Sequence, residues 1–184
     1  MCPSVRPASE TELGDMDPIR RSIAQSTERY GIADFDTVNA VVTIKRTATD
    51  LENFAASYCK QAELSPGRLN VLMALNAAPD KAMALSEIGE YLVVTRPNVT
   101  GLIDGLVADG LVKRIDHPED RRMVLAQLTP PGREFMRKFV PFHHRVICDV
   151  MSGMTRQEKR QIVTLLDKLR ARLREAQIPQ LEES

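Results

Sequence analysis

The sequence predicts a mainly α-helical protein with one small β-hairpin. Apolar residues recur at steps of three and four through most of the chain, which is the period of amphipathic helices. Two short helical segments follow one another in mid-chain with a very short turn between them. Two segments with strand-like patterning come directly afterwards. Together these observations predict a winged helix-turn-helix fold flanked by N- and C-terminal helices.

The composition is that of a folded protein without a strong overall charge. The 184 residues are 43% hydrophobic and 27% charged, so the chain can bury a core without disulfides or metals. A formal net charge of +0 argues against a general nucleic-acid coat protein. No apolar run approaches the ~18 residues of a membrane span, and the N-terminus lacks a signal-peptide core. Three separated cysteines favour a reducing, cytoplasmic location: Cys2, Cys59 and Cys148.

The N-terminal part is expected to be a tail followed by two helices. Residues 1–17 are rich in proline, serine and acids and predict a flexible tail. A short helix should run from Pro18 to about Tyr30, where Gly31 ends it. A long amphipathic helix should follow, with Asp36 as N-cap, and end near Gln61. We assign 18–62 to dimerisation.

A winged helix-turn-helix lobe is expected over 63–129. A helix should begin at Ser65-Pro66 and stop at Pro79. Ser86 should cap a short helix that ends at Leu92, and Thr95 should cap a second one that runs to Asp109. The turn between these two helices is only Val93-Val94.

A hairpin and two more helices should complete the chain. Strands are expected over 111–116 and 123–128, joined by a polar turn that ends in Arg121-Arg122. The next helix should start after Thr129 and be kinked by Pro141. Thr155 and Glu158 form a capping box for the last helix. The phenylalanine and leucine stripes of these two helices predict a core or dimer contact. We assign 130–178 to dimerisation and 179–184 to a tail.

The short second helix and the hairpin tip have the side chains that DNA recognition requires. The major groove admits one helix, whose N-terminal residues reach base edges. Arginine there pairs with guanine and asparagine with adenine, and an arginine at a wing tip can enter the narrow minor groove. Asp120 is expected to orient Arg122. The predicted DNA contacts are Ser86, Thr95, Arg96, Pro97, Asn98, Thr100, Arg121 and Arg122.

The same segments carry a family resemblance. The matching stretches are Leu85-Ser86-Glu87-Ile88-Gly89, Thr95-Arg96-Pro97-Asn98-Val99-Thr100-Gly101-Leu102-Ile103-Asp104, Gly110-Leu111-Val112, Asp120-Arg121-Arg122 and Leu128-Thr129. Through them the chain, from about Asp36 to Gln177, resembles the multiple antibiotic resistance regulators (the MarR family). The resemblance implies a triangular homodimer that binds an inverted-repeat operator, with N- and C-terminal dimerisation helices (18–62 and 130–178). It also implies a repressor released by a small phenolic or anionic effector, with no cofactor.

One position departs from the family's pattern, and several others have an open interpretation. Gly101 stands where family members often have a basic residue in the recognition helix. Tyr58, Asn70 and His143 could line the effector pocket implied by the resemblance, although core packing is the simpler explanation for each. His143-His144 has no third metal ligand at a suitable spacing, so no metal is expected.

Three other functions remain to be weighed against DNA binding. Acidic residues around the recognition helix and the wing, Asp104 and Asp109 among them, would suit a winged-helix protein–protein interaction module without DNA binding. Cys59 would suit a thiol-based redox sensor, although a buried cysteine is more often a small hydrophobic residue. An enzyme is not expected, because the sequence has no nucleophile elbow, phosphate loop or metal-ligand cluster.

Overall fold

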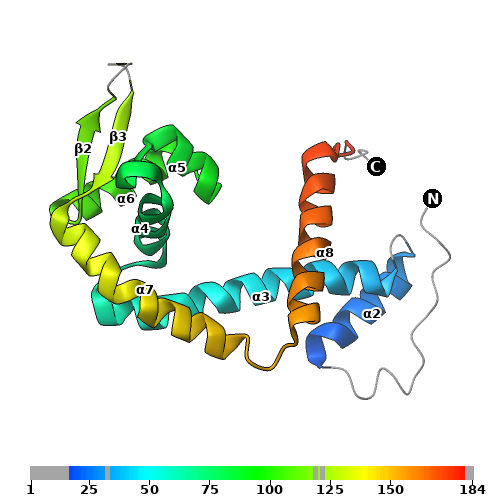
Figure 1. The fold of residues 1–184 in the computed structure, drawn as a ribbon. Coiled ribbons are helices and arrows are strands. Elements are labelled where there is room, and N and C mark those ends of the chain that lie inside the picture. The colour runs from blue at the N-terminus through cyan, green and yellow to red at the C-terminus, as the bar shows by residue number, and fades with distance from the viewer. Residues whose placement is uncertain (1–16, 32–33, 118–119, 121–122, 181–184) are drawn as a thin grey trace.

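A computed structural model of the protein describes residues 17–31, 34–117, 120 and 123–180. The elements in chain order are α2 (Pro18–Tyr30), α3 (Phe35–Cys59), η1 (Lys60–Ala62), α4 (Pro66–Ala77), η2 (Pro79–Lys81), β1 (Ala82–Ala84), α5 (Leu85–Leu92), α6 (Arg96–Ala108), β2 (Val112–Asp116), β3 (Val124–Leu128), α7 (Pro130–Val150) and α8 (Arg156–Glu175). Figure 1 shows a compact lobe made by α4 to β3, with α3 and α7 extending from it and α8 standing apart.

Side-chain caps set most of the helix starts. The Asp34 carboxylate accepts the Thr37 N–H at 2.8 Å, so α3 begins at Phe35. The prediction of Asp36 as N-cap is therefore wrong, because that residue lies inside the first turn. Ser65 caps α4 as predicted. The capping box of α8 is confirmed too, with the Glu158 carboxylate accepting the Thr155 N–H at 2.7 Å.

The first helix of the helix-turn-helix begins one residue earlier than predicted. Its N-cap position is Ala84, whose N–H donates to the Glu87 carboxylate at 2.9 Å. Ser86 lies within the first turn, so the prediction that it caps the helix is wrong. Thr95 holds the N-cap position of α6, but its side chain makes no capping hydrogen bond.

The predicted hairpin is one part of a three-stranded antiparallel sheet with the order β1-β3-β2. β2 and β3 pair in the register Val112 with Leu128, and each begins one residue later than the sequence predicted. β1 was not predicted. It is only three residues long and pairs Met83 with Ala126, and a strand so short shows too little alternation to be recognised.

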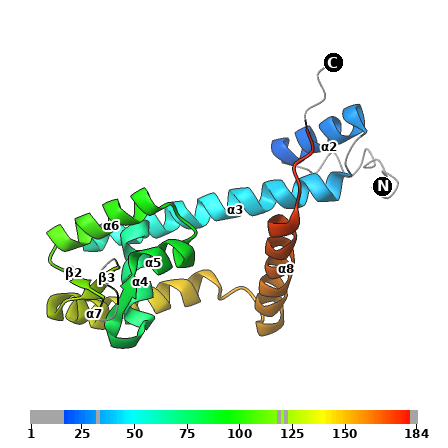
Figure 2. The same cartoon turned by 90° about the horizontal axis from the view of Figure 1, so that it is seen from above.

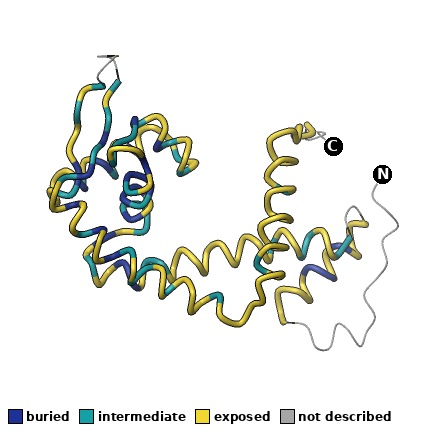
Figure 3. Tube along the Cα trace, viewed as in Figure 1, coloured by how far each residue is buried: buried dark blue, intermediate teal, exposed yellow. Residues whose placement is uncertain are grey.

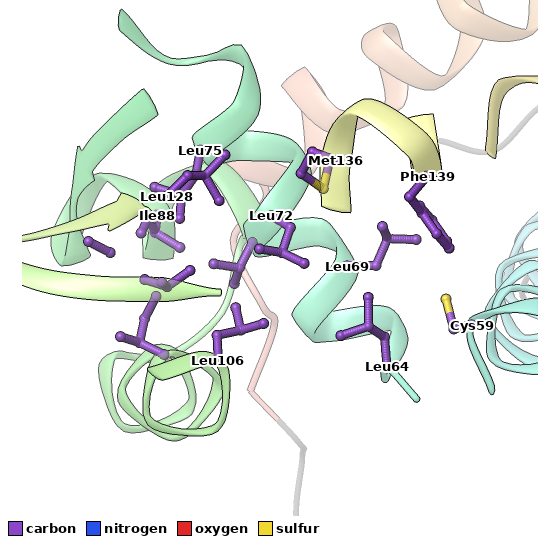
Figure 4. Close-up of a cluster of buried hydrophobic side chains, with 14 of the residues drawn as sticks. Cys59, Leu64, Leu69, Leu72, Leu75, Ile88, Leu106, Leu128, Met136 and Phe139 are labelled. Carbon is purple, nitrogen blue, oxygen red and sulfur yellow. The ribbon is translucent and has the colours of Figure 1, made fainter. Parts of the chain in front are cut away.

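One hydrophobic core joins the winged lobe to the long helices. Leu72, Leu75, Ile88, Leu106 and Leu128 meet at its centre and are almost fully buried (Figure 4). Burying each such side chain stabilises the fold by about 1.5–3 kcal/mol. At the other end of the core, Cys59 of α3 and Phe139 of α7 close the cluster, so the lobe cannot move without disturbing both helices.

The long helices expose much of their apolar surface. α2 packs along the N-terminal part of α3, as both views show (Figures 1 and 2). α8 stands apart from the lobe and has no buried residue, and most of its length is exposed (Figure 3). α7 continues through Pro141 as one helix. None of the helices in the described ranges is long and apolar enough to cross a membrane.

Candidate nucleic-acid interface

α6 is anchored by one face and leaves its N-terminal residues exposed. Val99, Ile103 and Leu106 follow helical spacing and are fully buried against the core. The five residues predicted to contact DNA from this helix are all exposed around its first turn: Thr95, Arg96, Pro97, Asn98 and Thr100. A helix anchored in this way can insert its N-terminal turn into a groove.

The first turn of α6 also leaves backbone donors without a side-chain cap. The Thr95 side chain does not accept any of the first-turn N–H groups, and Pro97 has none to offer. The Thr100 hydroxyl donates to the Arg96 carbonyl at 3.2 Å, so its lone pairs remain as acceptors. Uncapped N–H groups and the helix dipole favour an anion, such as a phosphate, at this end.

The turn between α5 and α6 is held by the backbone. Val93 adopts a left-handed conformation, with φ of 56°. The Val94 N–H donates to the Gly89 carbonyl at 3.0 Å, which fixes the angle at which α6 leaves the turn. A Cβ at Gly89 would lie 3.4 Å from the Val94 carbonyl oxygen, so the two segments are in van der Waals contact here. Ser86 is exposed on the first turn of α5.

Two ion pairs flank the second half of α6. Arg114 of β2 lies 2.6 Å from Asp104, and Arg68 of α4 lies 3.0 Å from Asp109. Each arginine side chain is about one-third exposed, at 36% and 33%. In the sequence alone, the negative charges of Asp104 and Asp109 argue against strong binding to DNA. Their partners could not be recognised there, because Arg68 is 41 residues from Asp109 along the chain.

The described part of the wing positions Asp120 at the end of the hairpin. The His117 N–H donates to the Met123 carbonyl at 3.1 Å, which closes the turn beyond β2 and β3. The Asp120 N–H donates to His117 Nδ1 at 3.2 Å. Arg121 and Arg122, the predicted minor-groove contacts, lie outside the described residues.

The end of α6 is tied to the start of α7. The Thr129 hydroxyl donates toward the carbonyls of Gly110 and Leu111, at 2.7 and 3.1 Å. The same oxygen accepts the Gly132 N–H at 3.0 Å and so caps α7. A Cβ on Gly132 would overlap the Leu111 carbonyl, so the two segments touch through backbone. The turn that follows α6 and the start of α7 are therefore in direct contact.

Two of the three predicted pocket residues meet. The Tyr58 hydroxyl lies 3.0 Å from His143 Nδ1, which joins α3 to α7. Phe142 packs edge-on against the Tyr58 ring, and Phe139 stacks on the His143 ring. Burial raises the pKa of Tyr58, and it lowers the pKa of His143, because each charged form is desolvated. Asn70 is exposed on α4 and has no hydrogen bond to this pair.

An aromatic groove lies next to that pair. It has a volume of about 360 Å³ and is lined by Gln61, Ala62, Phe135, Lys138, Phe139 and Phe142. The Lys138 ammonium at its edge is 3.2 Å from the Glu134 carboxylate. Hydrogen bonds from Arg137 and Lys138 lower the pKa of Glu134 to about 2. The sequence predicted these phenylalanines as core or dimer contacts, since periodicity does not distinguish a core face from a groove wall.

Cys59 has the features of a structural cysteine. It is fully buried, and burial raises the pKa of its thiol. A protonated, buried thiol is a poor nucleophile, which weighs against the redox alternative. Across the described residues, no group of three His, Cys, Asp or Glu side chains could hold a metal ion.

Comparisons with known proteins agree with this arrangement. A family model described as MarR family matches residues 63–123. The HTH-type transcriptional repressor YetL of Bacillus subtilis is 30% identical over 156 residues, which cover 85% of this chain and 93% of that protein.

Solved structures show the same fold. Sco3205, a MarR family transcriptional regulator from Streptomyces coelicolor solved in complex with DNA, superimposes with a TM-score of 0.68 at 23% identity. The match covers 73% of this chain and 88% of that one. Bordetella bronchiseptica BpsR, whose DNA binding is regulated by 6-hydroxynicotinic acid, gives a TM-score of 0.62 at 28% identity. Here 69% of this chain and 89% of that chain are covered.

Proposed function

The chain belongs to the MarR family of DNA-binding transcription regulators, and from this premise we propose that it is a sequence-specific repressor that a small aromatic effector releases from its operator. The observation that carries the proposal is the first turn of α6, where Arg96 and Asn98 are exposed on a helix whose opposite face is buried. Arginine and asparagine at that end are the side chains that read guanine and adenine. The similarity to YetL, a repressor, supports the sign of regulation.

The proposed repressor is a homodimer that works in the cytoplasm. Large apolar side chains are exposed along α3 and α8, including Val41, Leu51, Leu165 and Leu173. So much exposed apolar surface on helices that project from the lobe supports a second copy as its cover. A dimer with twofold symmetry would place two α6 helices about one DNA turn apart, so the operator should be an inverted repeat with ~10 bp between half-site centres.

The proposed effector site is the aromatic groove between η1 and α7. Its phenylalanine walls suit an aromatic ring, and the Lys138 ammonium at the edge suits a carboxylate. Regulation of BpsR by 6-hydroxynicotinic acid, an aromatic acid with a hydroxyl group, supports this class of effector. The groove opens on α7, and Thr129 ties the start of α7 to the end of α6. An effector that favours a shifted α7 must therefore lose affinity when DNA is bound.

Selection of bound fragments from sheared genomic DNA at physiological salt tests the proposal. Enrichment of one inverted repeat is expected, with loss of enrichment in the double variant Arg96→Ala/Asn98→Ala. Addition of 6-hydroxynicotinic acid or 4-hydroxybenzoate should weaken binding of the selected repeat, and Lys138→Ala should reduce that response. No enrichment by a folded dimer would instead favour a winged-helix protein–protein module.

A further inference from the structure

Arg68 lies outside the recognition helix and outside the wing, yet its side chain reaches α6. It is the third residue of α4, the helix that packs against α6. A Cβ added at Gly105 would overlap the Arg68 guanidinium. The guanidinium therefore occupies the space that a side chain at position 105 would take. Gly67 also approaches α6 closely, since its Cβ would lie 3.0 Å from the Leu102 side chain.

The position of Gly105 on α6 places this guanidinium on the side of the helix that carries Asn98. The two residues are seven apart, which is almost two full turns, so they share a face about 10 Å apart along the axis. The buried face of the helix points elsewhere, through Val99 and Ile103. Arg68 therefore extends the Asn98 side of α6 toward the C-terminal end of the helix.

A cation at this place would meet the DNA backbone. An α-helix with its side chains is about 10–12 Å wide, and the major groove is about 12 Å wide, so an inserted helix fills the groove. Beyond the N-terminal turn that reaches the bases, groups on the flank of the helix then face phosphates and not base edges. Without Arg68 and Arg114, the second half of α6 would present only the acidic side chains of Asp104 and Asp109 to those phosphates.

The ion pair with Asp109 holds the Arg68 guanidinium in place and leaves some of its N–H donors available. Arg68 Nη1 lies 3.0 Å from the Asp109 carboxylate. A guanidinium has five N–H donors, and a carboxylate on one edge leaves donors on the others. The Arg68 side chain is 33% exposed, so solvent or a phosphate can reach it.

We propose that Arg68 binds a DNA phosphate, and that α4 supplies this arginine to the flank of the recognition helix in the space left by Gly105. The inference rests on the proposed DNA-binding function and adds a contact that lies in neither α6 nor the wing. Asp109 acts in it as a positioning residue that fixes the guanidinium over Gly105.

The salt dependence of operator binding tests this directly. The slope of log affinity against log salt changes by about 0.9 for each phosphate that the protein neutralises. Arg68→Ala should therefore make the slope shallower by about 0.9 per bound recognition helix. For a dimer in which two arginines act in this way, the affinity of the wild type should fall about 12-fold more than that of the variant between about 50 and 200 mM salt. Arg68→Lys keeps the charge and should restore the slope.

Two further variants separate phosphate binding from a purely structural ion pair. Asp109→Asn removes the negative charge of the pair but keeps an oxygen that accepts the hydrogen bond from Arg68 Nη1, so the guanidinium stays in place and the slope should be unchanged. A structural role would make Asp109→Asn and Arg68→Ala equally harmful to thermal stability and would leave both slopes at the wild-type value. Arg137→Ala is the matched control, because it removes an exposed arginine that is paired with Glu134 on α7.

The outcomes are distinguishable. A shallower slope for Arg68→Ala, with Arg137→Ala and Asp109→Asn unchanged, supports the inference. An unchanged slope for Arg68→Ala overturns it while the DNA-binding function stands. A wild-type protein without salt-dependent DNA binding overturns the proposed function and this inference together.

Discussion

The side chains of the lobe include buried ones that form its core and exposed ones that can contact DNA. Asn98 is exposed on the first turn of α6, whereas its neighbour Val99 is fully buried. Tyr58 and His143 are different again, since they form a polar contact enclosed by Phe139 and Phe142. Substitution of Asn98 should change DNA affinity alone. Substitution of Tyr58 or His143 should change the stability of the fold.

Asn98→Ala should weaken binding to the selected operator by about 1–3 kcal/mol, because a bidentate contact to a base edge is worth that much. The melting temperature should hardly change, since the side chain is exposed. Fluorescence anisotropy with operator and scrambled DNA measures the effect. An equal weakening on both DNAs would show that Asn98 contacts phosphate and does not read a base.

His143 should make the fold sensitive to acid. Burial lowers the pKa of His143 in the folded state, so below the ordinary histidine pKa of about 6.5 the unfolded chain takes up the extra proton first. The contribution of His143 to stability is thus intact at neutral pH and declines as the pH falls through this range.

Denaturant unfolding of the wild type and of His143→Gln between about pH 5 and pH 8 checks this expectation. Glutamine keeps an acceptor for the Tyr58 hydroxyl but does not titrate. The gap in stability between the two proteins should narrow or reverse toward pH 5. A gap that stays constant with pH would remove His143 from the acid response.

At the scale of elements, the lobe depends on backbone contacts between segments distant in sequence. β1 pairs with β3 across more than forty residues, and Thr129 links the end of α6 to the start of α7. The start of α3 depends on which of two nearby aspartates caps the helix. Aspartate is an acceptable cap at either Asp34 or Asp36, and in the structure Asp34 holds this position.

Gly132→Ala should destabilise the protein by about 1–3 kcal/mol, the cost of forcing a methyl group into a packed contact. The overlap is with the Leu111 carbonyl, a backbone group that cannot move aside cheaply. Gly153→Ala is the matched control, because a Cβ there has no neighbour within 4 Å. Thermal and urea unfolding measure both; equal stability of the two variants would show that α7 can shift freely at its start.

At the scale of the whole molecule, the exposed surface of α8 is the feature that a single copy leaves unexplained. Its apolar side chains, including Leu165 and Leu166, lie on a helix without a buried residue. The isolated chain therefore does not account for why α8 keeps an apolar stripe. A second copy does, and it also doubles the number of recognition helices.

Leu165→Glu combined with Leu166→Glu should convert the dimer into a monomer and abolish operator binding at concentrations where the wild type is saturated. The reason is that charge buried in an apolar interface costs several kcal/mol. Sedimentation analysis and anisotropy measure the two effects. Gln161→Glu on the same helix is the control, and a dimeric double variant would mean that the interface lies elsewhere.

The sequence by itself determined the helices, the hairpin and the exposed end of α6, because these follow from local periodicity, caps and turn residues. It also named Tyr58, Asn70 and His143 as candidate pocket residues, and the structure showed that Tyr58 and His143 meet. Only the tertiary structure decided that Arg68 pairs with Asp109 and Arg114 with Asp104, that β1 completes the sheet, and that three phenylalanines line a groove. These contacts depend on how elements far apart in the chain pack together, and side-chain periodicity reports only which face of a helix is apolar, not what lies against it.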